Sequence, residues 1–177
     1  MNANASFPIP AGSQHKSVAE LVVGIDHVAV AVGDLEAAVD WAIGQLGCRL
    51  RELRETRGEA SGMRSAVLEL GGLILVLVQG TSASSQVAQF VARHGPGVQH
   101  LALRVSDITQ ASSALARRGM HFSTPQLDGD DLSQIFSTRD PRTGLMLELI
   151  QRHNGYLGFS DENVTRLFRS LEQRGEY

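Results

Sequence analysis

The sequence of 177 residues contains only one cysteine, Cys48. Without a second thiol, no disulfide can form within the chain, and this favours a reducing compartment, for which we expect the cytoplasm. Cys48 follows the predicted end of a helix and has no base beside it in the sequence. We therefore interpret it as a small packed residue and not as a nucleophile.

The sequence also lacks long apolar runs and an excess of charge of one sign. No apolar stretch reaches the roughly 18–20 residues that a membrane-spanning helix needs. The N-terminus has no basic segment followed by the apolar core of a secretory signal. Sixteen basic residues stand against 19 acidic ones, without a basic stripe. We therefore expect binding neither to membranes nor to nucleic acid.

The length and the apolar fraction of 42% suit one globular domain with a sizeable core. Residues 1–20 are rich in Asn, Ser, Pro and Gly and predict a flexible lead-in. We expect the single domain to occupy residues 21–177.

What the chain does contain is one pattern written twice. "GIDHVAVAV" at 24–32 and "GVQHLALRV" at 97–105 both run glycine, apolar, polar, histidine, and then alternate as a half-buried strand does. Each is followed by an aspartate that can cap a helix, Asp34 or Asp107, and then by three further strand-like segments. Each half therefore reads strand, helix and three strands, and this internal repeat predicts the fold.

The predicted fold class is α+β, with two tandem βαβββ modules forming a barrel and a C-terminal helix. The modules cover about 21–80 and 97–152, joined by a linker at 81–96, and the terminal helix covers 155–174. In that helix Leu167, Phe168 and Leu171 share one apolar side. The helix either packs against one end of the barrel or covers a site as a lid.

The repeat brings three ligand-type residues into register. Superposing "LILVLVQG" at 73–80 on "LMLELIQR" at 145–152 places Val76 opposite Glu148. If the modules meet face to face, His27 and His100 converge on Glu148, whose burial is costly unless it is paired or binds a metal. Two histidines and one carboxylate are typical of non-haem Fe(II) oxygenases. The alternative is that each is an ordinary core residue, with the glutamate paired to an arginine.

Three longer motifs carry a family resemblance: "SSQVAQFVARHGPGVQHLAL", "LSQIFSTRDPRTGLMLELIQR" and "GFSDENVTRLFRSLEQRG". On these, residues 24–174 resemble the C-terminal catalytic domain of the 4-hydroxyphenylpyruvate dioxygenase family, within the vicinal-oxygen-chelate superfamily. The resemblance implies that Fe(II) is held by His27, His100 and Glu148. It also implies polar pocket residues and an aromatic clamp around the substrate, namely Ser65, Gln86, Gln99, Gln134, Phe136 and Phe159.

The strand pattern qualifies this set. Gln134 and Phe136 are two residues apart and share a face, but Gln99 adjoins His100 and would point away from it on a regular strand. Val78 stands where the family has an asparagine, and Met146 or Leu147 replaces an aromatic residue. We expect Val78 and Met146 to face the metal and to make the pocket less polar.

The expected function is that of an Fe(II)-dependent dioxygenase that takes a 2-oxo acid and O₂, decarboxylates the acid oxidatively and hydroxylates it. One alternative is a non-redox isomerase, epimerase or lyase of the same superfamily that uses another divalent ion. A second alternative is a metal-free small-molecule-binding protein of the resistance type. A homodimer that covers the exposed strand edges is also possible.

Overall fold

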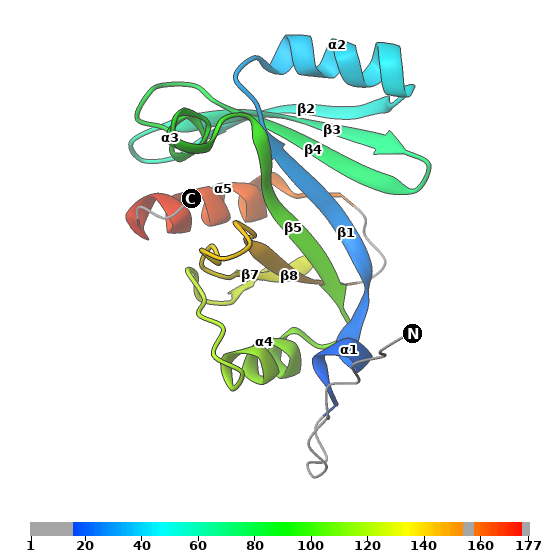
Figure 1. Cartoon of the computed structure of the whole chain (residues 1–177), viewed down its shortest axis with the longest axis vertical. Helices are drawn as coiled ribbons and strands as arrows, with labels where there is room; N and C mark the ends of the chain where they lie inside the picture. Colours follow the sequence, from blue (N-terminus) through cyan, green and yellow to red (C-terminus); the bar gives the residue numbers. More distant parts are fainter. Residues whose placement is uncertain (1–15, 154–157, 175–177) are drawn as a thin grey trace, which may run out of the picture.

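In the computed structural model, residues 16–153 and 158–174 are described, and eight strands form one curled sheet in the order β2-β3-β4-β1-β5-β8-β7-β6 (Figure 1). The first module contains β1 (Val22–Ala31), α2 (Leu35–Leu46), β2 (Arg49–Arg57), β3 (Gly62–Leu70) and β4 (Leu73–Gly80). The second contains β5 (Gly97–Val105), α4 (Ile108–Ala116), β6 (Leu127–Asp128), β7 (Leu132–Phe136) and β8 (Leu147–Arg152). Three further helices are α1 (Val18–Leu21), α3 (Gln86–His94) and α5 (Asp161–Arg174).

The strands of the two modules are arranged in the same way, as the repeat in the sequence predicts. Each module pairs its first strand in parallel with its last one, and the two first strands, β1 and β5, pair antiparallel at the centre. In the first module Ala29 lies beside Val76, and in the second Ala102 lies beside Glu148. The predicted α+β fold of two βαβββ modules is confirmed, and Val76 and Glu148 hold equivalent places in it.

Local capping explains where the two module helices begin. The Asp34 side chain accepts a hydrogen bond from the backbone of Ala37, and the Asp107 side chain accepts one from Gln110, so each satisfies a free N–H of the first turn. α2 ends at Gly47, whose φ of 72° favours glycine. α2 and α4 cover opposite ends of the curled sheet (Figure 1).

The terminal helix α5 lies between the two halves of the sheet, inside the curl (Figure 1). Its apolar side is buried as predicted: Phe168 and Leu171 are each only 1% exposed, and Phe168 packs with Val78 and Phe90. The helix starts at Asp161 and not at residue 155. The side chain of Ser160 accepts from the backbone of Asn163 and so caps the first turn, while residues 154–157 lie outside the described part.

Two other segments refine the predicted boundaries. The linker at 81–96 contains α3, whose buried side chains include Val87 and Phe90. Within the predicted lead-in, the one-turn helix α1 begins after Ser17, and the side chain of Glu20 accepts from the Ser17 backbone. The rest of the lead-in, at 1–15, lies outside the described residues.

Candidate metal centre and its cavity

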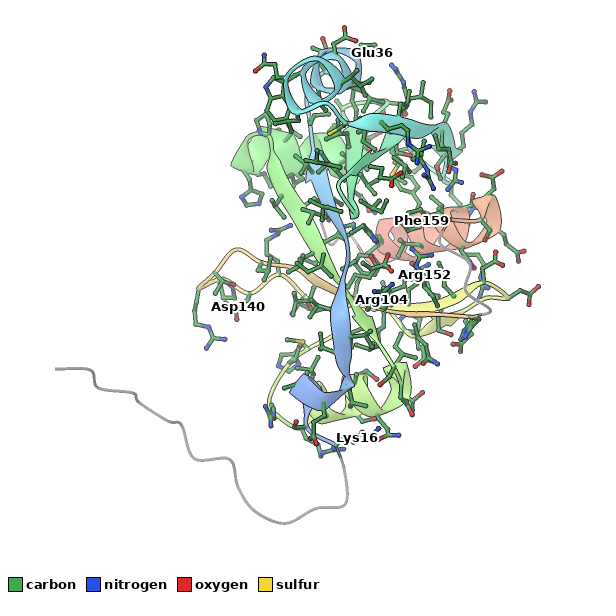
Figure 2. The ribbon with its side chains drawn as sticks, turned by 90° about the vertical axis from the view of Figure 1, so that its right-hand side faces the viewer. Lys16, Glu36, Arg104, Asp140, Arg152 and Phe159 are labelled. Atoms are coloured by element: carbon green, nitrogen blue, oxygen red, sulfur yellow. The ribbon has the colours of Figure 1, made fainter. Side chains whose placement is uncertain are left out.

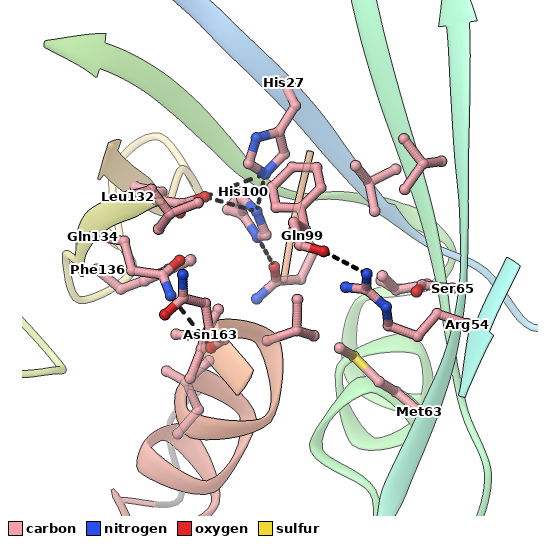
Figure 3. Close-up of a pocket in the computed structure, with 18 residues that line it drawn as sticks. His27, Arg54, Met63, Ser65, Gln99, His100, Leu132, Gln134, Phe136 and Asn163 are labelled. Atoms are coloured by element: carbon pink, nitrogen blue, oxygen red, sulfur yellow. Dashed lines mark hydrogen bonds and ion pairs between the residues drawn. The ribbon is translucent and has the colours of Figure 1, made fainter. Parts of the chain in front are cut away.

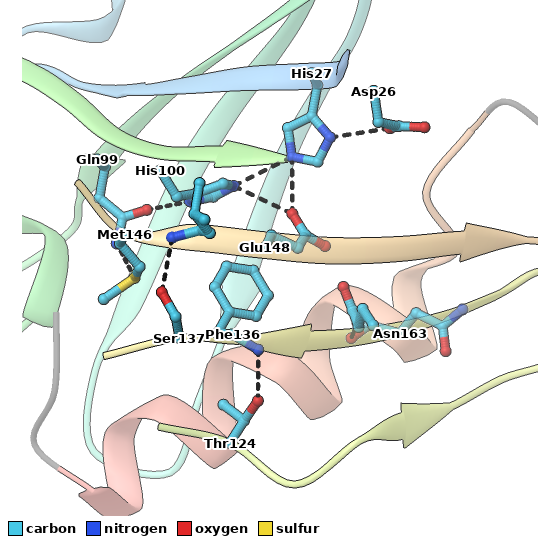
Figure 4. Close-up of polar contacts among 12 residues, drawn as sticks. Asp26, His27, Gln99, His100, Thr124, Phe136, Ser137, Met146, Glu148 and Asn163 are labelled. Carbon is cyan, nitrogen blue, oxygen red and sulfur yellow. Dashed lines mark hydrogen bonds and ion pairs between the residues drawn. The ribbon is translucent and has the colours of Figure 1, made fainter. Parts of the chain in front are cut away.

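Three side chains from β1, β5 and β8 meet at one point inside the curl; two are buried and that of His100 is 13% exposed. His27 Nε2 lies 3.1 Å from His100 Nε2 and 3.2 Å from Glu148 Oε2, and His100 Nε2 lies 3.4 Å from the same oxygen (Figure 4). Two ligands at right angles, each about 2.1 Å from an ion, are about 3 Å apart. The spacing of these donor atoms therefore fits three adjacent positions around one divalent metal.

A β-bulge precedes each histidine and shapes the site. Ile25 pairs with Leu103 and His27 with Ala102, so that Asp26 is an extra residue in β1. In the same way Gln99 is an extra residue in β5, between partners of Ala29 and Val30. A bulge lets neighbouring residues turn to the same side of the sheet. Gln99 would point away from His100 only on a regular strand, and the bulge removes that condition.

The two bulge residues, Asp26 and Gln99, hold the imidazole rings of the histidines that follow them in the same way. The Nδ1 atom of His27 is 3.0 Å from Asp26 Oδ1, and the Nδ1 atom of His100 contacts the side-chain oxygen of Gln99. With N–H on Nδ1, each ring in its neutral form would turn the lone pair of Nε2 to the centre of the cluster. This is the tautomer that a metal-binding histidine requires.

The electrostatics of the two rings differ. Burial alone would lower the pKa of His27, but the neighbouring Glu148 and Asp26 carboxylates raise it to about 9. Burial dominates at His100 and lowers its pKa. Burial would raise the pKa of Glu148, but the two histidines lower it to about 2. The metal-free cluster thus keeps a carboxylate beside one imidazolium, and a divalent cation would replace that proton.

A cavity opens from the cluster between the modules (Figure 3). Five of the six predicted pocket residues line it, namely Ser65, Gln99, Gln134, Phe136 and Phe159. Gln86 does not: it is buried in the first turn of α3, outside the cavity lining. Val78 lines the cavity, as does Val76. Met146 was expected there too, but it is buried elsewhere, and its sulfur accepts from the Gln99 amide.

Sequence reasoning missed two polar lining residues. Arg54 lies beside Ser65 in the β2–β3 pairing, and Ser65 lies beside Val78, so the three form a row across the sheet. Once Ser65 is placed in the pocket, this register is a signal that could have found Arg54. Asn163, on α5, could be found only from the docking of that helix. The Asn163 side chain lies close to Gly129: a Cβ added to Gly129 would be 2.2 Å from the side-chain oxygen of Asn163.

Two phenylalanines flank the cluster, one for each histidine. The ring of Phe159 meets that of His27 edge-on at 5.0 Å between centroids, and Phe136 meets His100 in the same way at 5.1 Å. Phe136 belongs to β7, whereas Phe159 lies in the segment before α5. Arg54 donates a hydrogen bond to the backbone carbonyl of Phe159 and so ties this segment to β2.

The structure is a curled sheet of two βαβββ modules that carries two histidines and one carboxylate on its inner face. Residues 26–136 match the model of the glyoxalase/bleomycin resistance protein/dioxygenase superfamily, and the chain belongs to this superfamily. The expected vicinal-oxygen-chelate fold is therefore confirmed.

Three relatives show how far the likeness extends. The 4-hydroxyphenylpyruvate dioxygenase-like protein of Rattus norvegicus is 33% identical over 128 residues, which cover 52% of this chain and 34% of the relative. A mutant of 4-hydroxymandelate synthase from Streptomyces coelicolor matches with a TM-score of 0.75 and 27% identity, over 86% of this chain and 54% of that one. Methylmalonyl-CoA epimerase from Mycobacterium tuberculosis matches with a TM-score of 0.63 and 29% identity, over 81% and 93%.

The chain spans about a third of the length of the rat relative and about half of the synthase. Within residues 16–153 and 158–174, no helix has the length and apolar character needed to cross a bilayer.

Proposed function

We propose that this protein is a non-haem Fe(II)-dependent dioxygenase that acts on a 2-oxo acid. One observation carries the proposal: the Nε2 atoms of His27 and His100 and one oxygen of Glu148 lie 3.1–3.4 Å apart, on the wall of a cavity. The equivalent place in the first module is Val76, which has no donor atom. Three ligands leave the remaining positions of an octahedral ion open to substrate and O₂.

The residues around the cluster suit this role. Fe(II), when bound, would supply the chelation of the acid and the redox chemistry with O₂. Phe136 and Phe159 flank the histidines and would hold the tail of the substrate between their rings. The side chain of Gln134 donates to the backbone of Asn163 and so holds α5 over the cavity. This cover would exclude water from the reaction.

The side chains that line the cavity indicate which substrate tail it accepts. Val76, Val78 and Leu167 offer apolar surface. Apart from the three ligands, the polar side chains of the lining are Arg54, Ser65, Gln99, Gln134 and Asn163. An aryl- or alkyl-pyruvate has this character, with a polar head for the metal and an apolar tail for the cavity. The compound in the name of the rat relative, 4-hydroxyphenylpyruvate, is an arylpyruvate.

A second candidate is a divalent-metal epimerase, which the 29% identity to methylmalonyl-CoA epimerase supports. Such a reaction needs a metal and a base beside the carbon acid, and no O₂. The polar groups closest to this role are the amides of Gln99 and Gln134, which are poor bases. For this reason we favour the dioxygenase.

The test is anaerobic reconstitution with Fe(II), followed by addition of O₂ with phenylpyruvate, 4-hydroxyphenylpyruvate or 4-methyl-2-oxopentanoate. We expect one O₂ consumed and one CO₂ released per turnover with at least one acid. His27→Ala should abolish turnover, whereas His121→Ala, which changes an exposed histidine outside the cavity, should leave it intact.

Two results would redirect the assignment. Exchange of deuterium into methylmalonyl-CoA without O₂, together with no O₂ uptake for any 2-oxo acid, would favour the epimerase. Failure to bind Fe(II), Co(II) or Zn(II) would favour the metal-free binding protein.

A further inference from the structure

Behind His27 lies a buried ion pair that joins β1 to β8. Asp26 accepts two hydrogen bonds from Arg152 of β8, each 2.7 Å long, in the forked geometry of a guanidinium facing a carboxylate. The two side chains are only 4% and 7% exposed. The same carboxylate accepts from His27 Nδ1 (Figure 4). Arg152 therefore fixes the group that fixes the ring.

The same guanidinium also holds the segment that closes the cavity. Its Nη1 atom donates to the backbone carbonyl of Gly158 at 2.7 Å, and its central carbon lies 5.1 Å from the centroid of the Phe159 ring. Phe159 in turn touches the His27 ring. Figure 2 shows Arg152 and Phe159 beside α5, on the side of the molecule opposite Asp140.

The second module has no equivalent ion pair. Gln99, the counterpart of Asp26, offers a neutral amide to His100, and its amide nitrogen donates to the sulfur of Met146. Arg139 donates to the backbone carbonyl of Gln99, not to its side chain. The charged support is thus specific to His27, although the two histidines occupy equivalent places.

We propose that Asp26 and Arg152 are positioning residues that orient His27 toward the metal and tie this orientation to the seating of Phe159. The inference rests on the proposed metal centre. A carboxylate that is itself locked by two hydrogen bonds allows the imidazole one orientation, so less freedom is lost when a metal binds. Because binding and seating share one guanidinium, each should strengthen the other to the same extent.

The first experiment titrates the metal-free full chain with Co(II) against a competing chelator. The variants are Asp26→Asn, Arg152→Lys, Arg152→Met and the double variant Asp26→Asn with Arg152→Met. Asp140→Asn, in an ion pair with the exposed Arg142, is the matched control. Far-ultraviolet circular dichroism and thermal unfolding check that each variant is folded.

We expect Asp26→Asn to weaken Co(II) binding by about 10–100-fold, as is typical when the partner of a metal-bound histidine is lost. Arg152→Met should have a similar effect, Arg152→Lys a smaller one, and the double variant little more than either single one, because the pair acts as a unit. At saturating Co(II), the visible absorption bands of Asp26→Asn should differ from those of the wild type. A merely structural role would leave them unchanged.

The outcomes separate this inference from the metal centre itself. No Co(II) binding by the wild type overturns both. If the wild type binds Co(II), and His27→Ala does not, but Asp26→Asn binds within twofold of the wild type with the same bands, only the positioning role is overturned. Asp140→Asn should behave as the wild type does, and a comparable loss there would also overturn it.

A second experiment tests the link to Phe159 by hydrogen exchange of the Phe159 and Ser160 amides. Saturating Co(II) should slow their exchange in the wild type and should not slow it in Arg152→Met. Equal slowing in both proteins would overturn the link.

Discussion

The two modules share a backbone and differ in chemistry. In each, a bulge residue precedes a histidine whose Nδ1 it holds, and an aromatic ring meets that histidine edge-on. The differences lie in side chains at matched places. Asp26 of the first module corresponds to Gln99 of the second, and Val76 of the first corresponds to Glu148 of the second. The repeat thus builds a symmetric scaffold, and a few substitutions make one asymmetric, three-ligand site in it.

The asymmetry also explains why the two histidines titrate differently. His27 stands between two carboxylates, Asp26 and Glu148, whereas His100 has one carboxylate and one amide. Although burial would raise it, the Arg152 guanidinium holds the pKa of Asp26 well below its usual range, so this carboxylate stays charged. The first module therefore supplies the more basic ligand, and the second supplies the anionic one.

The strongest test of the difference between the modules removes Glu148, the ligand that has no equivalent in the first module. Glu148→Gln keeps the shape but not the charge, and leaves His27 without its strongest partner. We expect metal affinity to fall by more than the roughly 10–100-fold typical of groups behind a ligand. Chelator competition measures this. Val76→Ala, at the equivalent place, should bind within about threefold of the wild type, and an equal loss in both variants would contradict the three-ligand site.

The next largest effect is the pH dependence of metal affinity, because a proton and the metal compete for His27. The pKa of His27, about 9 in the metal-free fold, lies above its value in an unfolded chain. The stabilisation from its proton is therefore present below pH 6.5 and is lost as the pH rises toward 9. A metal must displace that proton, so its apparent affinity should rise by about tenfold per pH unit over this range.

Thermal unfolding with and without metal checks this prediction. The metal-free melting temperature should fall from pH 6.5 to 9, and the gap between metal-loaded and metal-free protein should widen. A gap that is constant or narrows would show that His27 carries no proton to displace.

Symmetry can also be restored. Val76→Glu would place a second carboxylate at the place equivalent to Glu148. We expect divalent metal binding to persist and O₂-dependent turnover to fall by about tenfold or more, because one open position is then filled. Metal content per chain and O₂ uptake are the measurements. Val76→Leu, which adds bulk without a ligand atom, is the control, and an equal loss of turnover in both variants would point to crowding.

The smallest effect concerns the substrate tail. Since the inner wall carries Val76 and Val78, we expect kcat/KM for phenylpyruvate to equal or exceed that for 4-hydroxyphenylpyruvate. The hydroxyl would have few partners, and an unpaired buried polar group costs about 1–3 kcal/mol. A preference of about tenfold for the hydroxylated acid would mean that Ser65 or Arg54 binds the hydroxyl. Ser65→Ala would then remove that preference.

Periodicity along the chain was enough to find the duplicated fold and its three central side chains. The three ligand-type residues, His27, His100 and Glu148, lie on strands that the repeat aligns. Side chains alternate between the two faces along a strand, so the sequence tells which face each residue takes. Capping by Asp34 and Asp107 is equally local, since the partner N–H lies three residues away. These features depend on neighbours in the sequence or on a simple superposition of its halves.

Other features arise only when distant segments meet. A bulge is a mismatch between two strands, so the inward turn of Gln99 depends on its pairing with β1 and not on the pattern of β5 alone. Asp26 and Arg152 are 126 residues apart and meet because β1, β5 and β8 are neighbours in the sheet. Asn163 reaches the cavity only because α5 docks inside the curl. Such contacts follow from register and sheet curvature, which are set by the packing of the whole domain.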